Sequence, residues 1–255
     1  MKVRDQMGRE LEIKTPVRRI VSLVPSQTEF LYHLGLDAEV VGITKFCVHP
    51  EEWFRNKTRV GGTKNARVSR VKELCPDLII GNKEENDQAN IDDLKQIAPV
   101  WMSDIKTLDD AFEMMVELGK IVRKEEQAKI MVKQIQVKFD RLVLQPKKSA
   151  LYFIWKDPWM LAGADTFISD MLEKCGFINR ASGSRYPLLG EVNDEIDIIL
   201  LSSEPYPFKP ADMDEIQKKF PKAKVLFVDG EIFSWYGSRL LKATNYFQQL
   251  LTSIG

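Results

Sequence analysis

The sequence contains little histidine and little cysteine, and each shortage excludes a class of site. Only His33 and His49 occur among 255 residues, so a zinc or manganese site with three histidine ligands is excluded. Cys47, Cys75 and Cys175 lie far apart, and an odd number argues against a disulfide framework. Each stands among apolar residues, which predicts three buried structural thiols. We expect no metal site and no cofactor.

Net charge and long apolar runs are also absent. Lys plus Arg and Asp plus Glu number 37 each, so no global field favours nucleic acid or an acidic membrane. No apolar run approaches the roughly 18 residues of a membrane-spanning helix, so we expect no membrane insertion. The first residues lack the apolar core of a secretory signal. As the sequence stands, it predicts a cytoplasmic monomer, or a periplasmic protein if a signal precedes residue 1.

Catalytic motifs are missing as well. The chain has no G-x-S-x-G, no phosphate-binding P-loop, no G-x-G-x-x-G and no H-E-x-x-H. Apolar residues at 44% and charged residues at 29% are ordinary for a globular protein. The sequence therefore favours a binding protein over an enzyme.

Apolar β-rich runs alternate with helical patterns along most of the chain. The predicted strands cover 19–24, 39–45, 77–81, 99–103, 149–155, 196–202 and 224–229. Helical patterns lie at 27–34, 69–75, 88–97, 166–175, 212–219 and 237–252. Runs such as "DLIIG" and "KVLFVD" are almost wholly apolar, which is typical of parallel strands buried on both faces. The alternation predicts an α/β fold.

One segment interrupts the alternation. From Thr107 to Leu142, apolar residues recur at helical spacing over roughly 36 residues, about 54 Å if unbroken, or two helices divided at the charged "RKEE". The segment is too long for an ordinary crossover and predicts a spacer between two lobes. "SQTEFLYHLGL" and "DTFISDMLEKCGF" share a pattern, which suggests related lobes. The predicted domains are 1–106, a helical segment 107–146, and 147–255.

The junction "PSQTE", residues 25–29, has two compatible interpretations. Ser26 and Glu29 have the spacing of a capping box at a helix start. A helix that starts directly after a parallel strand also lies at the sheet edge where α/β proteins bind ligands, and its amide groups suit a polar or anionic group. We expect both to hold.

The order of these segments resembles that of the helical-backbone substrate-binding proteins of ABC importers, above all the cobalamin-binding branch. The resemblance is carried by "RIVSLVPSQTEFLYHLGL", "VVGIT", "VGGTKNARVSRVKELCPDLIIGN", the long helical segment, "FISDMLEKCGFIN" and "FSWYGSRLL". It implies two Rossmann-like lobes with parallel sheets, joined by a long bridging helix, with a ligand cleft between the lobes. It also implies a permease and an ATPase as partners, and no catalytic residues.

The resemblance further implies which residues contact a ligand. In the first lobe these are Pro25, Ser26, Gln27, Phe46, His49, Lys64 and Asn82. In the second lobe they are Trp155, Trp159, Arg185, Tyr186, Trp235 and Tyr236. The tryptophans and Tyr236 follow strands in loop-like segments, where large aromatics more often line a site than a core. As loop residues they are expected to support few core neighbours.

Some of these residues allow a second interpretation. Four basic residues either balance the charge of a ligand that carries carboxylates or are ordinary surface residues. They are Lys64, Arg67, Arg70 and Arg185. His49 contacts a ligand or metal, or is a solvated turn residue.

Three functions stay open. The first is binding of a corrinoid or a similar large metal chelate, which the aromatic loops favour. The second is binding of an iron-siderophore or haem on the same fold, for which basic residues matter more. The third is a cytoplasmic enzyme or chaperone that handles a tetrapyrrole, which only the missing signal favours.

Overall fold

The computed structural model describes residues 1–143, 147–190 and 195–254. They form two compact units, each described by itself below. Unit 1 comprises Met1–Ile105, Asp109–Gln134 and Tyr236–Arg239. Unit 2 comprises Lys106–Leu108, Ile135–Trp235 and Leu240–Gly255.

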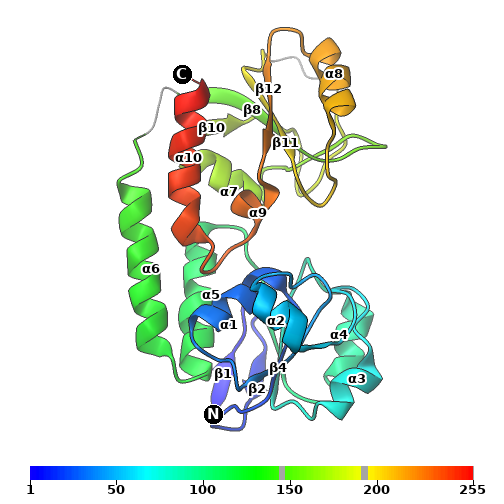
Figure 1. Cartoon of the computed structure of the whole chain (residues 1–255), viewed down its shortest axis with the longest axis vertical. Coiled ribbons are helices and arrows are strands. Elements are labelled where there is room, and N and C mark those ends of the chain that lie inside the picture. Colours follow the sequence, from blue (N-terminus) through cyan, green and yellow to red (C-terminus); the bar gives the residue numbers. More distant parts are fainter. Residues whose placement is uncertain (144–146, 191–194, 255) are drawn as a thin grey trace. The chain divides into compact units, whose positions relative to one another are not determined.

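Unit 1 contains a five-stranded parallel sheet with the order β5-β4-β3-β6-β7. The strands are β3 (Ile20–Ser22), β4 (Val40–Ile43), β5 (Thr58–Arg59), β6 (Leu78–Asn82) and β7 (Val100–Ser103). The helices are α1 (Pro25–His33), α2 (Glu51–Asn56), α3 (Val68–Glu73), α4 (Gln88–Leu94) and most of α5 (Leu108–Ile121). Every residue of β3, β6 and β7 is buried, because helices cover both faces of a parallel sheet (Figure 1). The four strands predicted for this part of the chain are confirmed.

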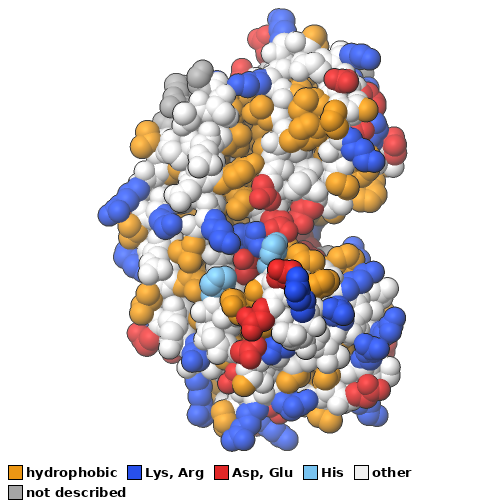
Figure 2. All heavy atoms as spheres, viewed as in Figure 1, with side chains coloured by type: hydrophobic (Ala, Val, Ile, Leu, Met, Phe, Trp, Pro, Cys, Tyr) orange, Lys and Arg blue, Asp and Glu red, His pale blue; other side chains and the backbone are white. Residues whose placement is uncertain are grey.

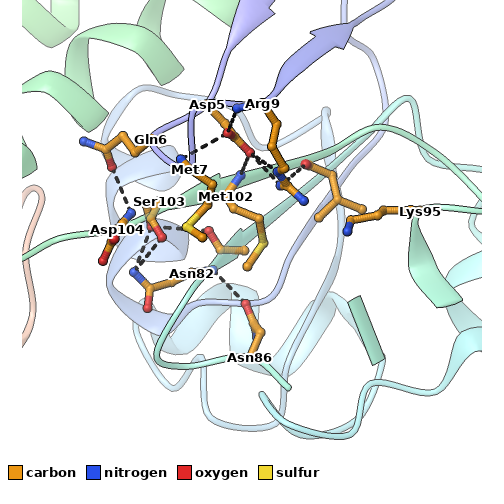
Figure 3. Close-up of polar contacts among 12 residues, drawn as sticks. Asp5, Gln6, Met7, Arg9, Asn82, Asn86, Lys95, Met102, Ser103 and Asp104 are labelled. Atoms are coloured by element: carbon orange, nitrogen blue, oxygen red, sulfur yellow. Dashed lines mark hydrogen bonds and ion pairs between the residues drawn. The ribbon is translucent and has the colours of Figure 1, made fainter. Parts of the chain in front are cut away.

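The N-terminal segment covers the free edge of that sheet. Strands β1 (Lys2–Arg4) and β2 (Glu10–Glu12) form an antiparallel hairpin. Between them, the N–H of Gln6 donates to the carbonyl of Met102 at 3.1 Å, and the carboxylate of Asp5 accepts the N–H of Met102 at 3.3 Å (Figure 3). Edge strand β7 therefore has partners for its backbone groups instead of an open edge. The hairpin was not predicted, because three-residue strands in a polar stretch have too few apolar positions to show alternation.

The long helical segment is two helices, which is the second of the two alternatives given by the sequence. Helix α5 ends at Ile121 and α6 (Glu125–Asp140) follows. Arg123 has a φ of 59°, and the N–H of Lys124 donates to the carbonyl of Gly119 at 2.6 Å, which ends α5. A Cβ on Gly119 would lie 2.5 Å from that of Ala128, so the glycine permits α5 and α6 to pack closely. Helix α6 contributes residues to both units.

Unit 2 contains a second parallel sheet with the order β10-β8-β11-β12, and β9 pairs with β8 in the antiparallel direction. The strands are β8 (Lys148–Trp155), β9 (Met160–Leu161), β10 (Phe177–Asn179), β11 (Ile198–Ser202) and β12 (Lys224–Val228). The helices are α7 (Phe167–Lys174), α8 (Pro210–Lys219), α9 (Gly230–Ser234) and α10 (Leu240–Ile254). The three predicted strands are confirmed as β8, β11 and β12, and the α/β class with parallel sheets is confirmed for the chain.

Different helices pack against the two faces of the second sheet. Phe153 and Leu201 pack with Ile216 of α8 on one face. On the other face the ring of Tyr152 lies 5.2 Å from that of Phe233 in α9. Alternation along β8 therefore directs successive side chains into two separate cores.

Two of the three thiols are buried as predicted, and one is not. Cys47 and Cys175 are buried, whereas Cys75 is exposed. Cys75 lies in the turn after α3 with a φ of 42°, and its apolar neighbours are not enough to bury a side chain at that turn.

Candidate functional site

Helix α1 starts directly after β3, but the predicted capping box does not form. The helix begins at Pro25, and its N-cap Val24 makes no side-chain cap hydrogen bond. Proline fits the first helical position, where its missing N–H costs nothing. The carboxylate of Glu29 does not return to the helix start, because it pairs with Arg239 at 2.8 Å and 3.1 Å. The capping-box interpretation of Ser26 and Glu29 is therefore wrong.

The start of α1 belongs to a buried polar cluster at the carboxyl ends of β3, β6 and β7. The side-chain amide of Gln27 donates to the hydroxyl of Ser103 at 2.6 Å. The side-chain amide of Asn82 donates to the same hydroxyl at 2.9 Å (Figure 3). Burial raises the pKa of Tyr236 far above its ordinary value, and the polar side chains of Ser103, Ser26 and Gln27 oppose this rise only in part. The structure thus brings together Ser26, Gln27 and Asn82, which were predicted for the first lobe, and Tyr236, and all four are buried. Tyr236 was predicted for the second lobe, but it packs in unit 1.

The other predicted residues of unit 1 are more exposed. Phe46, in the turn after β4, is 50% exposed, and the ammonium of Lys45 lies 4.9 Å from its ring centre. A Cβ on Gly62 would lie 3.4 Å from that ring, so Phe46 packs against the turn that carries the exposed Lys64. His49 is half-buried. These residues lie at or near the strand ends, as predicted, and their contact with a ligand stays a prediction.

Four aromatic side chains gather in unit 2 where β8 and β11 end, and we call Trp155, Trp159, Tyr206 and Phe208 the aromatic group. Trp155 is the last residue of β8 and is 41% exposed, with its ring 5.6 Å from that of Tyr206. Tyr206 lies 4.8 Å from Phe208, which stacks on Trp159 at 5.9 Å with an interplanar angle of 2°. The first two were predicted from their position after a strand. Tyr206 and Phe208 were missed, although "SSEPYPF" after β11 shows the same signal.

The ammonium of Lys156, which lies beside the ring of Trp159, is paired with carboxylates. The ammonium of Lys156 lies 2.7 Å from both Asp212 and Glu215, and 5.1 Å from the ring centre of Trp159. Hydrogen bonds with Asp212 and Glu215 hold the pKa of Lys156 above its ordinary value. Lys156 therefore acts as a support for the aromatic group, not as a free charge for a ligand.

An acidic pocket opens at the same edge of the sheet. Its lining residues are Ser203, Glu204, Phe227, Val228, Asp229 and Glu231. One carboxylate oxygen of Glu204 accepts the hydroxyl of Ser234 and the indole N–H of Trp235, each at 2.8 Å. Burial raises the pKa of Glu204. Acidic side chains gather in Figure 2 over the place that α9 has in Figure 1. Glu204 was missed, because no motif surrounds it.

Trp235 differs from the expectation for a loop residue. It follows directly after α9 and is only 7% exposed. Its contact with Glu204 and its burial give it a role in the core of unit 2, so the expectation of few core neighbours is wrong for this residue.

Arg185 and Tyr186 lie in an irregular segment of unit 2 and are half-buried. Arg185 has a φ of 58°, its N–H donates to the carboxylate of Asp165, and its carbonyl accepts the N–H of Gly163 at 2.6 Å. These backbone contacts fix the segment, and ligand contacts of the two side chains stay predictions.

Within residues 1–143, 147–190 and 195–254, no group of three or more His, Cys, Asp and Glu side chains is arranged to hold a metal ion. The helices described in this structure include none with the length and apolarity to cross a bilayer.

The chain is similar in sequence to known binding proteins. The chain is 32% identical over 182 residues to an uncharacterized ABC transporter substrate-binding lipoprotein, YvrC, of Bacillus subtilis, covering 66% of this chain and 57% of that protein. It is 26% identical over 249 residues to a vitamin B12-binding protein of Pectobacterium carotovorum, covering 93% and 89%. The chain thus spans somewhat more than half of the first relative and most of the second.

Solved structures show the same fold. A possible iron-binding periplasmic protein of Staphylococcus epidermidis matches with a TM-score of 0.78 at 23% identity, covering 93% of this chain and 98% of that one. The periplasmic vitamin B12-binding protein of Vibrio cholerae matches with a TM-score of 0.70 at 19% identity, covering 94% and 98%. The model of the periplasmic binding protein family matches residues 20–235. As the resemblance in sequence predicted, the chain belongs to the periplasmic binding protein family, a family of binding proteins and not of enzymes.

Proposed function

We propose that the chain is the substrate-binding component of an ABC importer and that it binds a corrinoid, such as cobalamin or cobinamide, or a closely related metal chelate. Family membership supports the general function. The vitamin B12-binding relative, aligned over 93% of the chain, supports the ligand class. In this role the protein acts outside the cytoplasm, with a permease and an ATPase as partners.

The aromatic group of unit 2 is the observation that carries the ligand class. Trp155 stands at the carboxyl end of a parallel strand, where α/β proteins bind ligands, and much of its ring is exposed. Its edge-to-face contact with Tyr206 holds it in place without burying it. A large flat ligand buries such a ring and gains about 25 cal/mol for each Å² of apolar surface removed from water.

The proposed ligand surfaces are the strand carboxyl ends of each unit. In unit 1 they include Phe46, His49 and Lys64, next to the buried cluster of Ser26, Gln27, Asn82 and Tyr236 and the adjoining Pro25. In unit 2 they comprise the aromatic group, the acidic pocket, and the segment of Arg185 and Tyr186.

Calorimetry with a panel of ligands tests the proposal. Cobinamide and cobalamin are expected to bind with a Kd at or below the micromolar range, which corresponds to about −8 kcal/mol or stronger. Haem and a ferric siderophore are the comparison ligands. If only the titration with the siderophore gives a heat of binding, the result would favour the alternative function described below.

The alternative is an iron-siderophore or haem receptor. Lys45 beside Phe46 and the exposed Lys64 favour it, because they place positive charge near the strand ends of unit 1. Similar structures include the iron-binding protein named above and a periplasmic haem-binding protein of Roseiflexus. The enzyme alternative has no support from the family.

A further inference from the structure

We propose that Glu204 determines which chelates the site accepts. Its carboxylate accepts N–H donors from the ligand and disfavours ligands that carry carboxylates. This inference rests on the proposed function, and it names a residue of unit 2 that discriminates between the corrinoid and its alternatives.

The backbone of Glu204 is fixed at the end of β11. The hydroxyl of Ser202 donates to the carbonyl of Glu204 at 2.5 Å and accepts the N–H of Glu204 at 3.3 Å. The buried hydroxyl of Tyr152 donates to the same Ser202 oxygen at 3.0 Å. Glu204 is therefore held by a short chain of hydrogen bonds from the sheet core.

The side chain of Glu204 uses only one of its two oxygens within the protein. Oε1 accepts hydrogen bonds from the hydroxyl of Ser234 and the indole N–H of Trp235. Oε2 has no hydrogen-bond partner among the residues that the structure describes. An ionised carboxylate offers about four acceptor positions, so two or more stay available. Because Glu204 lines the pocket, a donor on a ligand there can use them.

Gly230 makes room for this arrangement. A Cβ on Gly230 would lie 2.7 Å from Cγ of Glu204 and 3.0 Å from its backbone nitrogen. Any larger residue would displace Glu204 from its place against α9. The close approach is thus part of how the sequence positions the carboxylate.

The charged residues that line the pocket of Glu204 have one sign. Asp229 and Glu231 line the same pocket, and none of its lining residues is cationic. Lys156, which follows β8, is paired with Asp212 and Glu215. A pocket lined by charge of one sign repels ligands of that sign and attracts complementary ones.

This field separates the candidate ligands by their chemistry. The side chains of a corrin ring end in neutral amides, whose N–H groups can donate to Glu204. Haem has two propionates, and the ferric complexes of tris-catecholate siderophores carry a net negative charge, so both bring negative charge to an acidic pocket. Placing like charges together is an effective way to reject a wrong partner. The three carboxylates do not hold a bare metal ion, since the described residues contain no such arrangement.

The test is the ratio of the Kd for cobinamide to the Kd for haem, measured in the wild-type chain and in Glu204→Gln. Glutamine keeps Oε1 as an acceptor for Ser234 and Trp235 but removes the charge. We expect the Kd for cobinamide to rise about tenfold, as for the loss of a hydrogen bond to a charged group, and the Kd for haem to fall. Glu173→Gln is the control, because it removes one exposed carboxylate that does not line the pocket, and it should leave both constants unchanged.

Asp229→Asn provides a second variant, because asparagine can keep the Oδ1 bond to the N–H of Glu231. It should shift the ratio in the same direction even if Glu204→Gln does not fold. Binding by the wild-type chain with an unchanged ratio in the folded variants would overturn the role of Glu204 and leave the proposed function standing. A folded wild-type chain that binds none of the ligands would overturn both.

Discussion

Glu29 and Arg239, 210 positions apart in the chain, form a buried ion pair with two hydrogen bonds inside unit 1. Their side chains are only 5% and 8% exposed. The pair attaches the segment Tyr236–Arg239 to α1, whose first turn also lies against Tyr236.

Removing one member of this pair should be costly. Arg239→Ala leaves a buried carboxylate without its partner, which typically costs about 3–5 kcal/mol of stability. Replacing both residues, as in Glu29→Leu with Arg239→Met, should recover part of the loss, because no unpaired charge remains. Denaturant unfolding gives the values. Arg4→Ala, which breaks an ion pair with Glu10 whose side chains are 69% and 77% exposed, should cost about 1 kcal/mol or less. Equal losses in Arg239→Ala and Arg4→Ala would contradict the importance of the buried pair.

Trp155 should matter for binding and little for folding. Trp155→Ala is expected to weaken corrinoid binding by about 1–3 kcal/mol, as for other truncated aromatic contacts. Because the ring is 41% exposed, the free energy of unfolding should change by about 1 kcal/mol or less. Calorimetry and denaturant unfolding measure the two effects. Ile130→Ala, an exposed apolar residue on α6, should change neither. Unchanged affinity in Trp155→Ala would remove the aromatic group from the site.

Trp235 should behave in the opposite way. It is buried, so Trp235→Ala should lower stability by about 3–5 kcal/mol, as for other core tryptophans. Trp235→Phe keeps most of the ring but loses the N–H donated to Glu204, and should cost about 1–3 kcal/mol. Thermal or denaturant unfolding distinguishes these values. A stable Trp235→Ala protein that has lost ligand affinity would restore the original expectation of a loop residue at a ligand surface.

The raised pKa of Glu204 predicts a pH dependence of stability. Burial disfavours its charged form, so its folded-state pKa lies above the ordinary 4.5. The contribution of Glu204 to stability is complete below pH 4.5 and is lost as the pH rises through the folded-state pKa. The stability of Glu204→Gln relative to wild type should therefore increase with pH across this window. Denaturant midpoints of both proteins at a series of pH values measure this difference, and a difference that stays constant would contradict the shift.

Burial on both faces was predicted correctly for "DLIIG" in β6 but wrongly for "KVLFVD" in β12, which is an edge strand with Lys224 and Phe227 exposed. Elements held by distant contacts were not predictable. Runs such as "DLIIG" have only one environment that suits every side chain, namely the centre of a covered parallel sheet. The capping box failed because Glu29 has a stronger partner 210 positions away, which local spacing cannot reveal. Short strands β1, β2, β9 and β10 depend on pairing with neighbours, since their own two or three residues carry no pattern.

The same difference applies to the site. Trp155 was predicted from the family resemblance and from its place after a strand, and its contact with a ligand stays a prediction. Glu204 and Tyr206 were not predicted, because only the fold brings Glu204 to Trp235 and Tyr206 to Trp155. The hydrogen bond between Trp235 and Glu204 is likewise not visible in the sequence around either residue.

Equilibrium dialysis of the purified wild-type chain against cobinamide tests the central proposal most directly, because it measures bound corrinoid from its own absorbance. We predict saturable binding of about one corrinoid per chain with a Kd at or below the micromolar range. Trp155→Ala should retain its fold and bind more weakly. The proposal of corrinoid binding is contradicted if the corrinoid concentration is equal on both sides of the membrane while the same folded protein binds haem or a ferric siderophore to saturation.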